Sequence, residues 1–335
     1  MSTTRPSRSA ATTWCSTCAS PTCERPDMNA ACSMRGLTLV ELLVVVFILA
    51  LLAQAAVYAG EGALESAQRE TTVSSLQQLE IALLGQPGRV DSQGRPHVGG
   101  FVADLGSLPV HAQGGAEQVL RELWERPVGA PAPRALPAFA LAQAPGDPEV
   151  QLGCGWRGPY MRLGFGAAAL RDGFGQPFTT RDVAGQATTI GAPIAAIVSL
   201  GADQLDGGPG FAADRPIVVQ RTAAPLQAPR HLGTVPVQVQ TSPSGGAVLV
   251  VRVYGPRDGA LATLQQVVLT PFAAGSTVTL NLVDVPIGPR IVRAYQVAQA
   301  PATPDTPLAA VSKSRVQPVA VEPFASPIVE LLVQP

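Results

Sequence analysis

The hydrophobic pattern is strongest near the N-terminus, where one long apolar run stands out. Leu42 to Ala53 are twelve uninterrupted apolar residues. Residues 37–58 would form a helix about 33 Å long, which is enough to cross a bilayer core. Arginines precede this run and Glu61 follows it. The excess of positive charge on the N-terminal side predicts a single-pass segment with a cytoplasmic N-terminus.

Beyond the apolar run, the pattern changes to that of an amphipathic helix. Apolar residues recur at a spacing of three to four, and no proline occurs between Leu37 and Leu84. Gly85 and Pro87 are expected to end the helix. The sequence therefore predicts one long helix over residues 37–85, whose second half packs on a globular head through Val73, Leu76, Leu79 and Leu83.

The C-terminal third alternates with the period of β-strands. Turn signals separate the strand candidates, which favours a small antiparallel sandwich over residues 234–335. A linker at 221–233 and a β-rich periplasmic head at 86–220 complete the predicted domains. The fold class is α+β. The strand candidates are Val235–Val239, Ala247–Tyr254, Thr263–Thr270, Val278–Val285 and Ile291–Val297, and a last strand is expected from Val319–Val321 and Ile328–Val333.

Composition and charge exclude some functions. The formal net charge is −1 and 14% of residues are charged, so no basic field is available to hold a nucleic acid backbone. The three histidines, His97, His111 and His231, are isolated along the chain. The sequence has neither a nucleophile elbow nor a phosphate-cradling glycine loop before a helix. We expect neither an enzyme nor a nucleic-acid-binding protein.

Glu41 is the one carboxylate inside the apolar run. An unpaired charge near the bilayer centre costs about 2.5 kcal/mol or more, so a partner has to be found for it. A carboxylate so close to the helix end has the alternative of reaching the lipid headgroups. The residues around Glu41 favour a more specific explanation.

The stretch Gly36-Leu37-Thr38-Leu39-Val40-Glu41, followed by apolar residues, resembles the class III signal of type IV pilins and type II secretion pseudopilins. The resemblance implies that a prepilin peptidase removes residues 1–36 as a leader and methylates the new N-terminus at Leu37, where the family usually has phenylalanine. It also implies that Glu41 pairs with the Leu37 ammonium of a neighbouring subunit, which neutralises two charges and fixes the axial stagger.

Other interpretations of the N-terminal region stay open. An ordinary secretory signal would be cut near Ala55, and an unprocessed anchor would leave Gly36 and Glu41 without a role. Met28 and Met34 are alternative starts that would still leave a short leader. Four cysteines precede the predicted cut and only Cys154 follows it, so the mature chain is expected to lack an internal disulfide.

A second resemblance lies in the head. Gly158-Pro159-Tyr160, followed by Asp172-Gly173-Phe174-Gly175-Gln176-Pro177-Phe178, is similar to two segments of the major type II secretion pseudopilin. Gly173, Phe174, Gln176 and Phe178 depart from the family pattern. The residues themselves predict a turn, with Gly175 at positive φ, that leads into a strand bounded by aromatic residues.

The run from Leu200 to Asp214 is rich in glycine and carboxylates. Carboxylates and backbone carbonyls are the ligands that Ca²⁺ prefers. The run resembles the calcium-binding loop of the major pseudopilins, with Asp203 and Asp214 matching its two aspartates and the Leu200 carbonyl as a further ligand. Asp206 lies at a position that is often acidic in this family and is expected to support the ligands without binding the ion directly. Gln204 replaces a family glycine, and Arg215-Pro216 interrupts the end of the pattern.

These features together predict a structural, pilin-like subunit of a type II secretion pseudopilus, anchored in the inner membrane and assembled into a helical fibre. The implied partners are the prepilin peptidase, other pilin-like subunits, the inner-membrane assembly platform and the secretion ATPase machinery. A type IV or minor pilin with an adhesive β-domain is the alternative. A membrane-tethered binding protein that merely retains the signal is the third hypothesis.

Overall fold

The structure is a computed structural model that describes residues 38–86, 89, 99–113, 115, 118–129, 132–164, 167, 169–218, 230–243, 248–273, 275–323 and 326–334. Side chains are described for these residues except 56–61 and 311. The chain divides into two compact units, Met1–Val57 and Tyr58–Pro335, each of which is described by itself.

A single long helix, α1 (Leu39–Leu84), opens the described chain. Its 46 residues confirm the predicted helix. Gly85 follows at a φ of 76° and donates its N–H to the carbonyl of Ile81 at 2.8 Å, which is the left-handed ending expected of a glycine. A side chain at Gly85 would also overlap the carbonyl of Gly99. The predicted stop at Pro87 lies outside the described residues.

The membrane segment was predicted over residues 37–58, most of which lie in α1. No helix in the described part of the chain combines the length and the apolarity that a membrane crossing requires. Side chains of α1 are described over residues 39–55 and again over 62–84, and the predicted span of residues 37–58 extends past the first of these ranges.

The second half of α1 packs into the core of the head. Leu76, Leu79 and Leu83 are buried as predicted, whereas Val73 is only half-buried. Three positions spaced by three and four residues put one stripe of the helix against the head. Each such leucine contributes about 1.5–3 kcal/mol of burial free energy. The core around them includes Phe101, Leu105, Leu123, Phe178, Ile194, Ile197 and Ile287.

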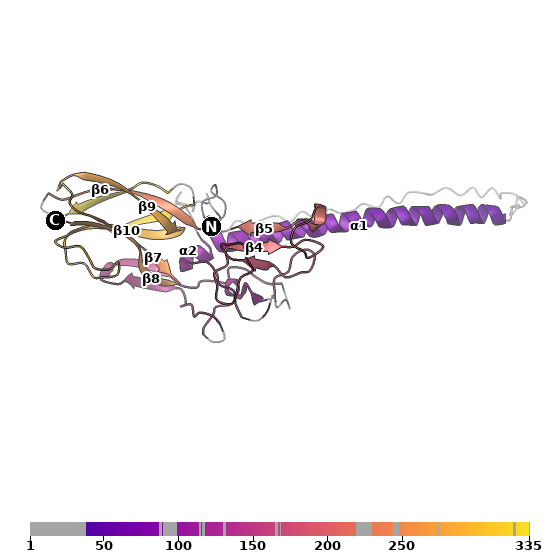
Figure 1. Ribbon diagram of the computed structural model, residues 1–335, viewed down its shortest axis with the longest axis horizontal. Coiled ribbons are helices and arrows are strands. Elements are labelled where there is room, and N and C mark those ends of the chain that lie inside the picture. The colour runs from indigo at the N-terminus through magenta and orange to yellow at the C-terminus, as the bar shows by residue number, and fades with distance from the viewer. Residues whose placement is uncertain are drawn as a thin grey trace, which may run out of the picture. The chain divides into compact units, whose positions relative to one another are not determined.

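The head is built from short elements. Strands β3, β4 and β5 form a small antiparallel sheet in that order, which Figure 1 shows beside α1, and β1 and β2 form a separate hairpin. This hairpin lies partly in residues 127–148, whose many prolines and alanines predict a loop. The elements are α2 (Phe101–Leu105), η2 (Arg121–Leu123), β1 (Ala140–Ala144), β2 (Asp147–Cys154), β3 (Thr179–Arg181), β4 (Ala196–Ser199), η3 (Gly210–Ala212) and β5 (Arg215–Val218).

The C-terminal region contains eight strands. The first five predicted strands are present, the predicted last strand is present as two separate strands, β12 and β13, and β11 was not predicted. Their bounds are β6 (Leu232–Gln240), β7 (Val248–Arg257), β8 (Ala260–Leu269), β9 (Thr277–Pro286), β10 (Gly288–Val297), β11 (Ala310–Ser314), β12 (Gln317–Val321) and β13 (Val329–Gln334).

These eight strands make one mixed sheet that nearly closes on itself. Its order is β8-β7-β10-β11-β13-β6-β9, and β12 pairs with β10. The prediction of a β-rich C-terminal region is confirmed. The purely antiparallel arrangement is wrong, because β13 runs parallel to β6 and connects the two halves of the sheet. Alternating valines from both halves fill the interior.

The head and the mixed sheet pack against each other within the unit Tyr58–Pro335. The short helix α2, seen between the two in Figure 1, is buried along its whole length. Gly259, at the tip of the β7–β8 hairpin, donates its N–H to the carbonyl of Leu105 at 3.0 Å. The predicted linker at 221–233 lies mostly outside the described residues, and the boundaries 86–220 and 234–335 stay predictions.

Arg290 is the central polar residue of this packing. Its side chain is fully buried and donates hydrogen bonds to five backbone carbonyls, with distances of 2.6–3.4 Å. Burial lowers the pKa of Arg290 to about 9, so the guanidinium stays charged at neutral pH. Two of its acceptors belong to α2 and three to the chain where β9 passes into β10: Val102, Ala103, Pro286, Ile287 and Pro289.

Replacing Arg290 with lysine is therefore expected to destabilise the protein. An ammonium has three donors, so at least two buried carbonyls would lose their partner, at about 2–4 kcal/mol in total. Urea unfolding of Arg290→Lys measures this loss. Arg315→Lys, at an exposed position, is the matched control and should change the stability little. Equal stability of the two variants would contradict the role given to Arg290.

Candidate functional site

The predicted processing site lies at the edge of the described chain. Gly36 and Leu37 are outside the described residues, whereas Glu41 lies in the first turn of α1 and is exposed. The hydroxyl of Thr38 accepts a hydrogen bond from the Glu41 N–H at 3.2 Å. Thr38 and Glu41 thus have the spacing of a capping box, and the helix N-terminus favours a carboxylate at this place. Local capping and pairing with a neighbour are compatible roles for Glu41.

The first part of α1 is an apolar surface without a partner among the described residues. Its large side chains are exposed by amounts from 47% at Val44 and Val45 to 80% at Leu39. A continuous apolar surface of this kind is typical of a segment that another molecule or lipid covers. Glu41 is the single carboxylate in this stretch of residues 39–55.

The predicted turn at residues 171–176 lies directly against α1. The Asp172 carboxylate accepts hydrogen bonds from the N–H groups of Phe174 at 3.0 Å and Gln176 at 2.8 Å, which closes the turn. Its second oxygen accepts from the Ser199 hydroxyl at 2.7 Å. Gly175 has a φ of 80°, as predicted, and the chain continues through the buried Phe178 into β3.

The same turn occurs a second time, ten residues later. Residues 171–176 read RDGFGQ and residues 181–186 read RDVAGQ. In both copies the aspartate accepts two backbone N–H bonds, and the arginine donates to the carbonyl of the glycine four residues on. This repeat was not predicted from the sequence. The shared pattern R-D-x-x-G-Q was the signal that could have found it.

The two copies differ at the residue that follows the aspartate, and α1 explains why. Gly173 donates its N–H to the Thr72 hydroxyl at 2.9 Å, and a Cβ on Gly173 would overlap the backbone carbonyl of Gln68. The second copy has Val183 at this place. Glycine at 173 is therefore the condition for backbone contact between the turn and the helix.

The acidic loop closes on itself, but its carboxylates are not gathered at one point. Asp203 caps a local turn, Asp206 pairs with Arg181, and one oxygen of Asp214 accepts the Gly207 N–H at 3.0 Å. Among the described residues no group of three or more histidine, cysteine, aspartate or glutamate side chains has the arrangement of a metal site. Gln204, which replaces a family glycine, has a positive φ of 61°.

One observation in this loop does fit a cation. The second oxygen of Asp214, Oδ1, is buried and makes no hydrogen bond. A buried carboxylate oxygen without a partner is costly unless a donor or an ion satisfies it. Of the predicted ligands Leu200, Asp203 and Asp214, Asp214 is the one with a buried oxygen that lacks a partner, while Asp206 is engaged by Arg181.

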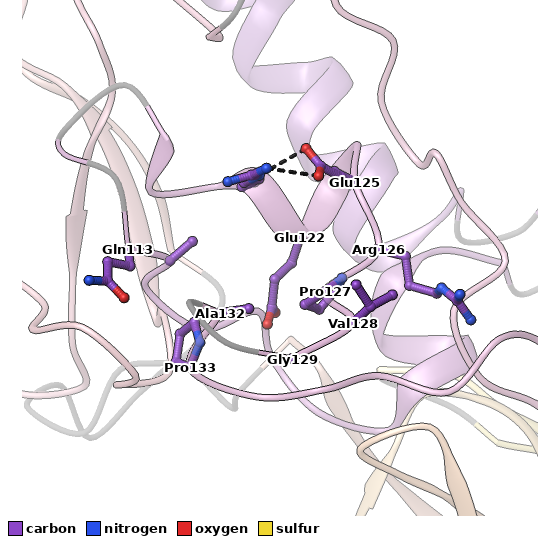
Figure 2. A pocket seen from close by; sticks show the side chains of 11 residues that line it. Gln113, Glu122, Glu125, Arg126, Pro127, Val128, Gly129, Ala132 and Pro133 are labelled. Carbon is purple, nitrogen blue, oxygen red and sulfur yellow. Dashed lines mark hydrogen bonds and ion pairs between the residues drawn. The ribbon is translucent and has the colours of Figure 1, made fainter.

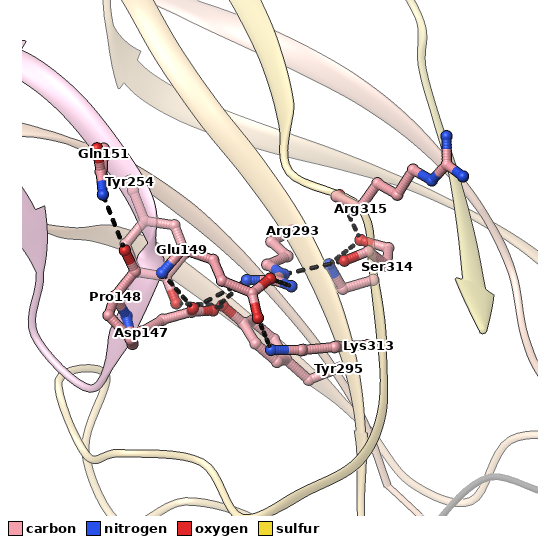
Figure 3. Close-up of polar contacts among 11 residues, drawn as sticks. Asp147, Pro148, Glu149, Gln151, Tyr254, Arg293, Tyr295, Lys313, Ser314 and Arg315 are labelled. Atoms are coloured by element: carbon pink, nitrogen blue, oxygen red, sulfur yellow. Dashed lines mark hydrogen bonds and ion pairs between the residues drawn. The ribbon is translucent and has the colours of Figure 1, made fainter. Parts of the chain in front are cut away.

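A buried polar network connects the β1–β2 hairpin to the mixed sheet (Figure 3). Arg293 donates to both oxygens of Asp147 at 2.7 and 2.9 Å and to Glu149 at 2.6 Å. The hydroxyl of Tyr295 donates to Asp147 at 2.6 Å. Burial raises the pKa of Tyr295, so this tyrosine stays protonated as a donor. The network satisfies its own members and serves as a structural joint.

A small pocket of about 120 Å³ lies beside η2 (Figure 2). Glu122 beneath it is 2% exposed, and its carboxylate is taken by Arg134 and by the Val110 N–H. Arg121 on the rim is paired with Glu125 at 2.8 Å. These paired charges leave the pocket without a reactive group, so it adds no chemistry to the site.

Groups suited to covalent chemistry are few among the described residues. Cys154 is buried, and burial raises the pKa of its thiol. A raised pKa disfavours the thiolate that a nucleophilic cysteine needs. The His111 ring hydrogen-bonds the Thr188 hydroxyl at 2.7 Å, in a chain of hydroxyls that continues to Thr180. His97 lies outside the described residues.

Comparison with known proteins gives no match: no family model, no curated protein and no solved structure is similar to this chain.

The contact between Gly173 and α1 can be tested by a pair of substitutions at equivalent places in the two turns. Gly173→Ala should push the turn away from Gln68 and cost about 1–3 kcal/mol of unfolding free energy. Val183→Ala, in the second turn, should stay within about 0.5 kcal/mol of the parent. Chemical denaturation of both variants measures the difference. A Gly173→Ala protein as stable as Val183→Ala would show that the turn does not depend on this contact.

Proposed function

We propose that this protein is a pilin-like structural subunit of a type II secretion pseudopilus. In this proposal a prepilin peptidase cuts the chain between Gly36 and Leu37 and methylates Leu37. The mature subunit is held in the inner membrane by the first part of α1, with its head in the periplasm. An assembly platform and a secretion ATPase then draw it into a helical fibre. The work of the subunit is mechanical.

The observation that carries the proposal is the contrast between the two parts of α1. Residues 39–55 present exposed apolar side chains with Glu41 as their single carboxylate, whereas Leu76, Leu79 and Leu83 are buried in a head. A helix that is apolar all round needs lipid or other helices around it. A neighbour's N-terminal ammonium would neutralise Glu41 in such surroundings.

The head supports the proposal less directly. The turn at Asp172–Gln176, on which the resemblance to the major pseudopilin rests, contacts α1 through Gly173. The 200–214 loop carries the unpaired Asp214 oxygen at a predicted ligand position. The large C-terminal sheet favours no single role, so a type IV or minor pilin with an adhesive domain is the second candidate. It differs from the first in the machine it would serve, and loss of secretion on deletion would select the first.

The first experiment is intact-mass measurement and N-terminal sequencing of the chain recovered from membranes, with and without prepilin peptidase. The proposal expects a methylated N-terminus at Leu37 that depends on the peptidase. A chain that stays uncut, or one cut near Ala55, would refute the pilin-like pathway.

The role of Glu41 is tested by Glu41→Ala in the same cells. The substitution leaves Gly36 and the apolar run in place, so cleavage should continue at the parent level. Incorporation into fibres should be lost, because the Leu37 ammonium of the neighbour has no counter-charge in the assembled helices. Sheared fibres quantified by immunoblot report the outcome. Thr38→Ala, which removes the cap but keeps the charge, is the control and should still assemble.

Calcium binding is tested by thermal unfolding of the full chain in detergent, with Ca²⁺ or with a chelator. Calcium at a hundred times its dissociation constant would add about 2.7 kcal/mol, which raises the melting temperature by several degrees. Asp214→Asn should abolish the increase. Asp284→Asn, on the exposed side of β9, should keep it. A parent protein that does not respond to calcium would remove the ion from the proposal.

A further inference from the structure

A groove runs along one side of α1, next to the face that the helix buries in the head. It has a volume of about 520 Å³, and Ser75 and Gln78 form its helix wall. The opposite wall is formed by residues 161–164, 167 and 169–171, with the buried Met161 and the half-buried Leu170 as apolar surface. Arg162 is exposed at this groove and, within the described residues, makes no hydrogen bond or ion pair.

We infer that this groove receives the α1 helix of a second copy of the chain, with Glu70 of that copy paired with Arg162. The inference rests on the proposed function, because it describes a contact inside the fibre. Glu70 is exposed on α1 and makes no hydrogen bond or ion pair within the described residues. The contact therefore joins a free cation on one copy to a free carboxylate on the next.

The position of the two groups around the helix suits a fibre. At about 100° per residue, Ser75 lies about 75° from the centre of the buried stripe of Leu76, Leu79 and Leu83. Gln78 and Glu70 both lie on the outward side of the helix, and Glu70 is about 80° from Gln78 and about 140° from Ser75. The groove wall and Glu70 are thus neighbouring but separate positions around α1. A contact between two different surfaces is heterologous, and heterologous contacts that do not close into a ring generate open helical fibres.

The axial positions agree with the pairing proposed for Glu41. If the Leu37 ammonium of one copy reaches Glu41 of another, the copies are staggered by four residues, or about 6 Å along the helix. Copies related by one repeated operation have the same stagger at every level. Glu70 of the first copy then lies level with Ser74 of the second, within one helical turn of Ser75 and Gln78. A single stagger thus satisfies both charge pairs.

The expected energy of the pair decides how it should be measured. An exposed ion pair contributes about 0.2–1 kcal/mol, so binding strength alone is a poor readout. Like charges in the same place are unfavourable and would disturb the register. The proximity of Glu70 and Arg162 is therefore best measured by crosslinking. Their attraction is best tested by exchanging the two charges.

The experiment introduces Glu70→Cys together with Arg162→Cys and oxidises membranes of cells that contain the prepilin peptidase and the assembly machinery. The leader cysteines are removed by the cut, and the remaining Cys154 is buried. Disulfide-linked dimers and longer multimers are expected, because each copy carries both cysteines and the contact repeats along the fibre. The control pair is Glu65→Cys with Arg162→Cys, because Glu65 lies about 140° away around the helix from Glu70. This pair should give no dimer.

A charge exchange provides the second measurement and guards against a cysteine variant that fails to fold. Arg162→Glu alone should lose fibres, and the double variant Arg162→Glu with Glu70→Arg should recover them. Absence of the dimer and of recovery, in cells where the chain starts at Leu37 and Glu41→Ala blocks assembly, would overturn the groove contact and leave the proposed function intact. A chain that is not cut at Gly36 would overturn both.

Discussion

The burial of the short helix α2 is the constraint on which the rest of this structure depends. Five residues, Phe101–Leu105, lie entirely inside the protein. A buried helix of this length cannot satisfy most of its own backbone groups, so partners have to come from elsewhere in the chain. The carbonyls of Val102 and Ala103 accept from Arg290, and that of Leu105 accepts from Gly259. The head and the sheet are joined because α2 belongs to the head and takes its missing hydrogen-bond donors from the sheet.

The side chains around α2 follow the same requirement. Asp104 is 2% exposed and would be an expensive buried charge without a partner. Arg157 pairs with it, and the Tyr160 hydroxyl donates to it at 3.1 Å. Close backbone contact with α2 also requires glycine at two places. A Cβ on Gly106, at the end of α2, would overlap the carbonyl of Pro256, and a Cβ on Gly288, at the start of β10, would lie 2.7 Å from the Cα of Ala103.

Periodicity was sufficient to predict the long helix and most strands, because burial of one face imposes a local repeat. Leu76, Leu79 and Leu83 and the alternating valines of β6 are examples. The hairpin β1–β2 was missed because prolines and alanines obscured its alternation. The parallel pairing of β13 with β6 and the burial of Arg290 depend on residues far apart in the sequence, and arginine ordinarily indicates surface. Glu41 could be singled out from the sequence because it is the one carboxylate in an apolar run. Arg162 could not, because its place at the groove is visible only in the structure.

The joint at α2 bears on how a subunit of this kind would transmit force. In the proposed fibre, a load on α1 enters the head through Leu76, Leu79 and Leu83 and the Gly173 turn. It then reaches the mixed sheet through Arg290 and the Arg293–Asp147 pair. Removing one partner of the buried Arg293–Asp147 pair costs about 3–5 kcal/mol, because it leaves a charge unpaired. The sheet would therefore move with the head as one body, so any surface it presents would be carried by the fibre at a fixed position.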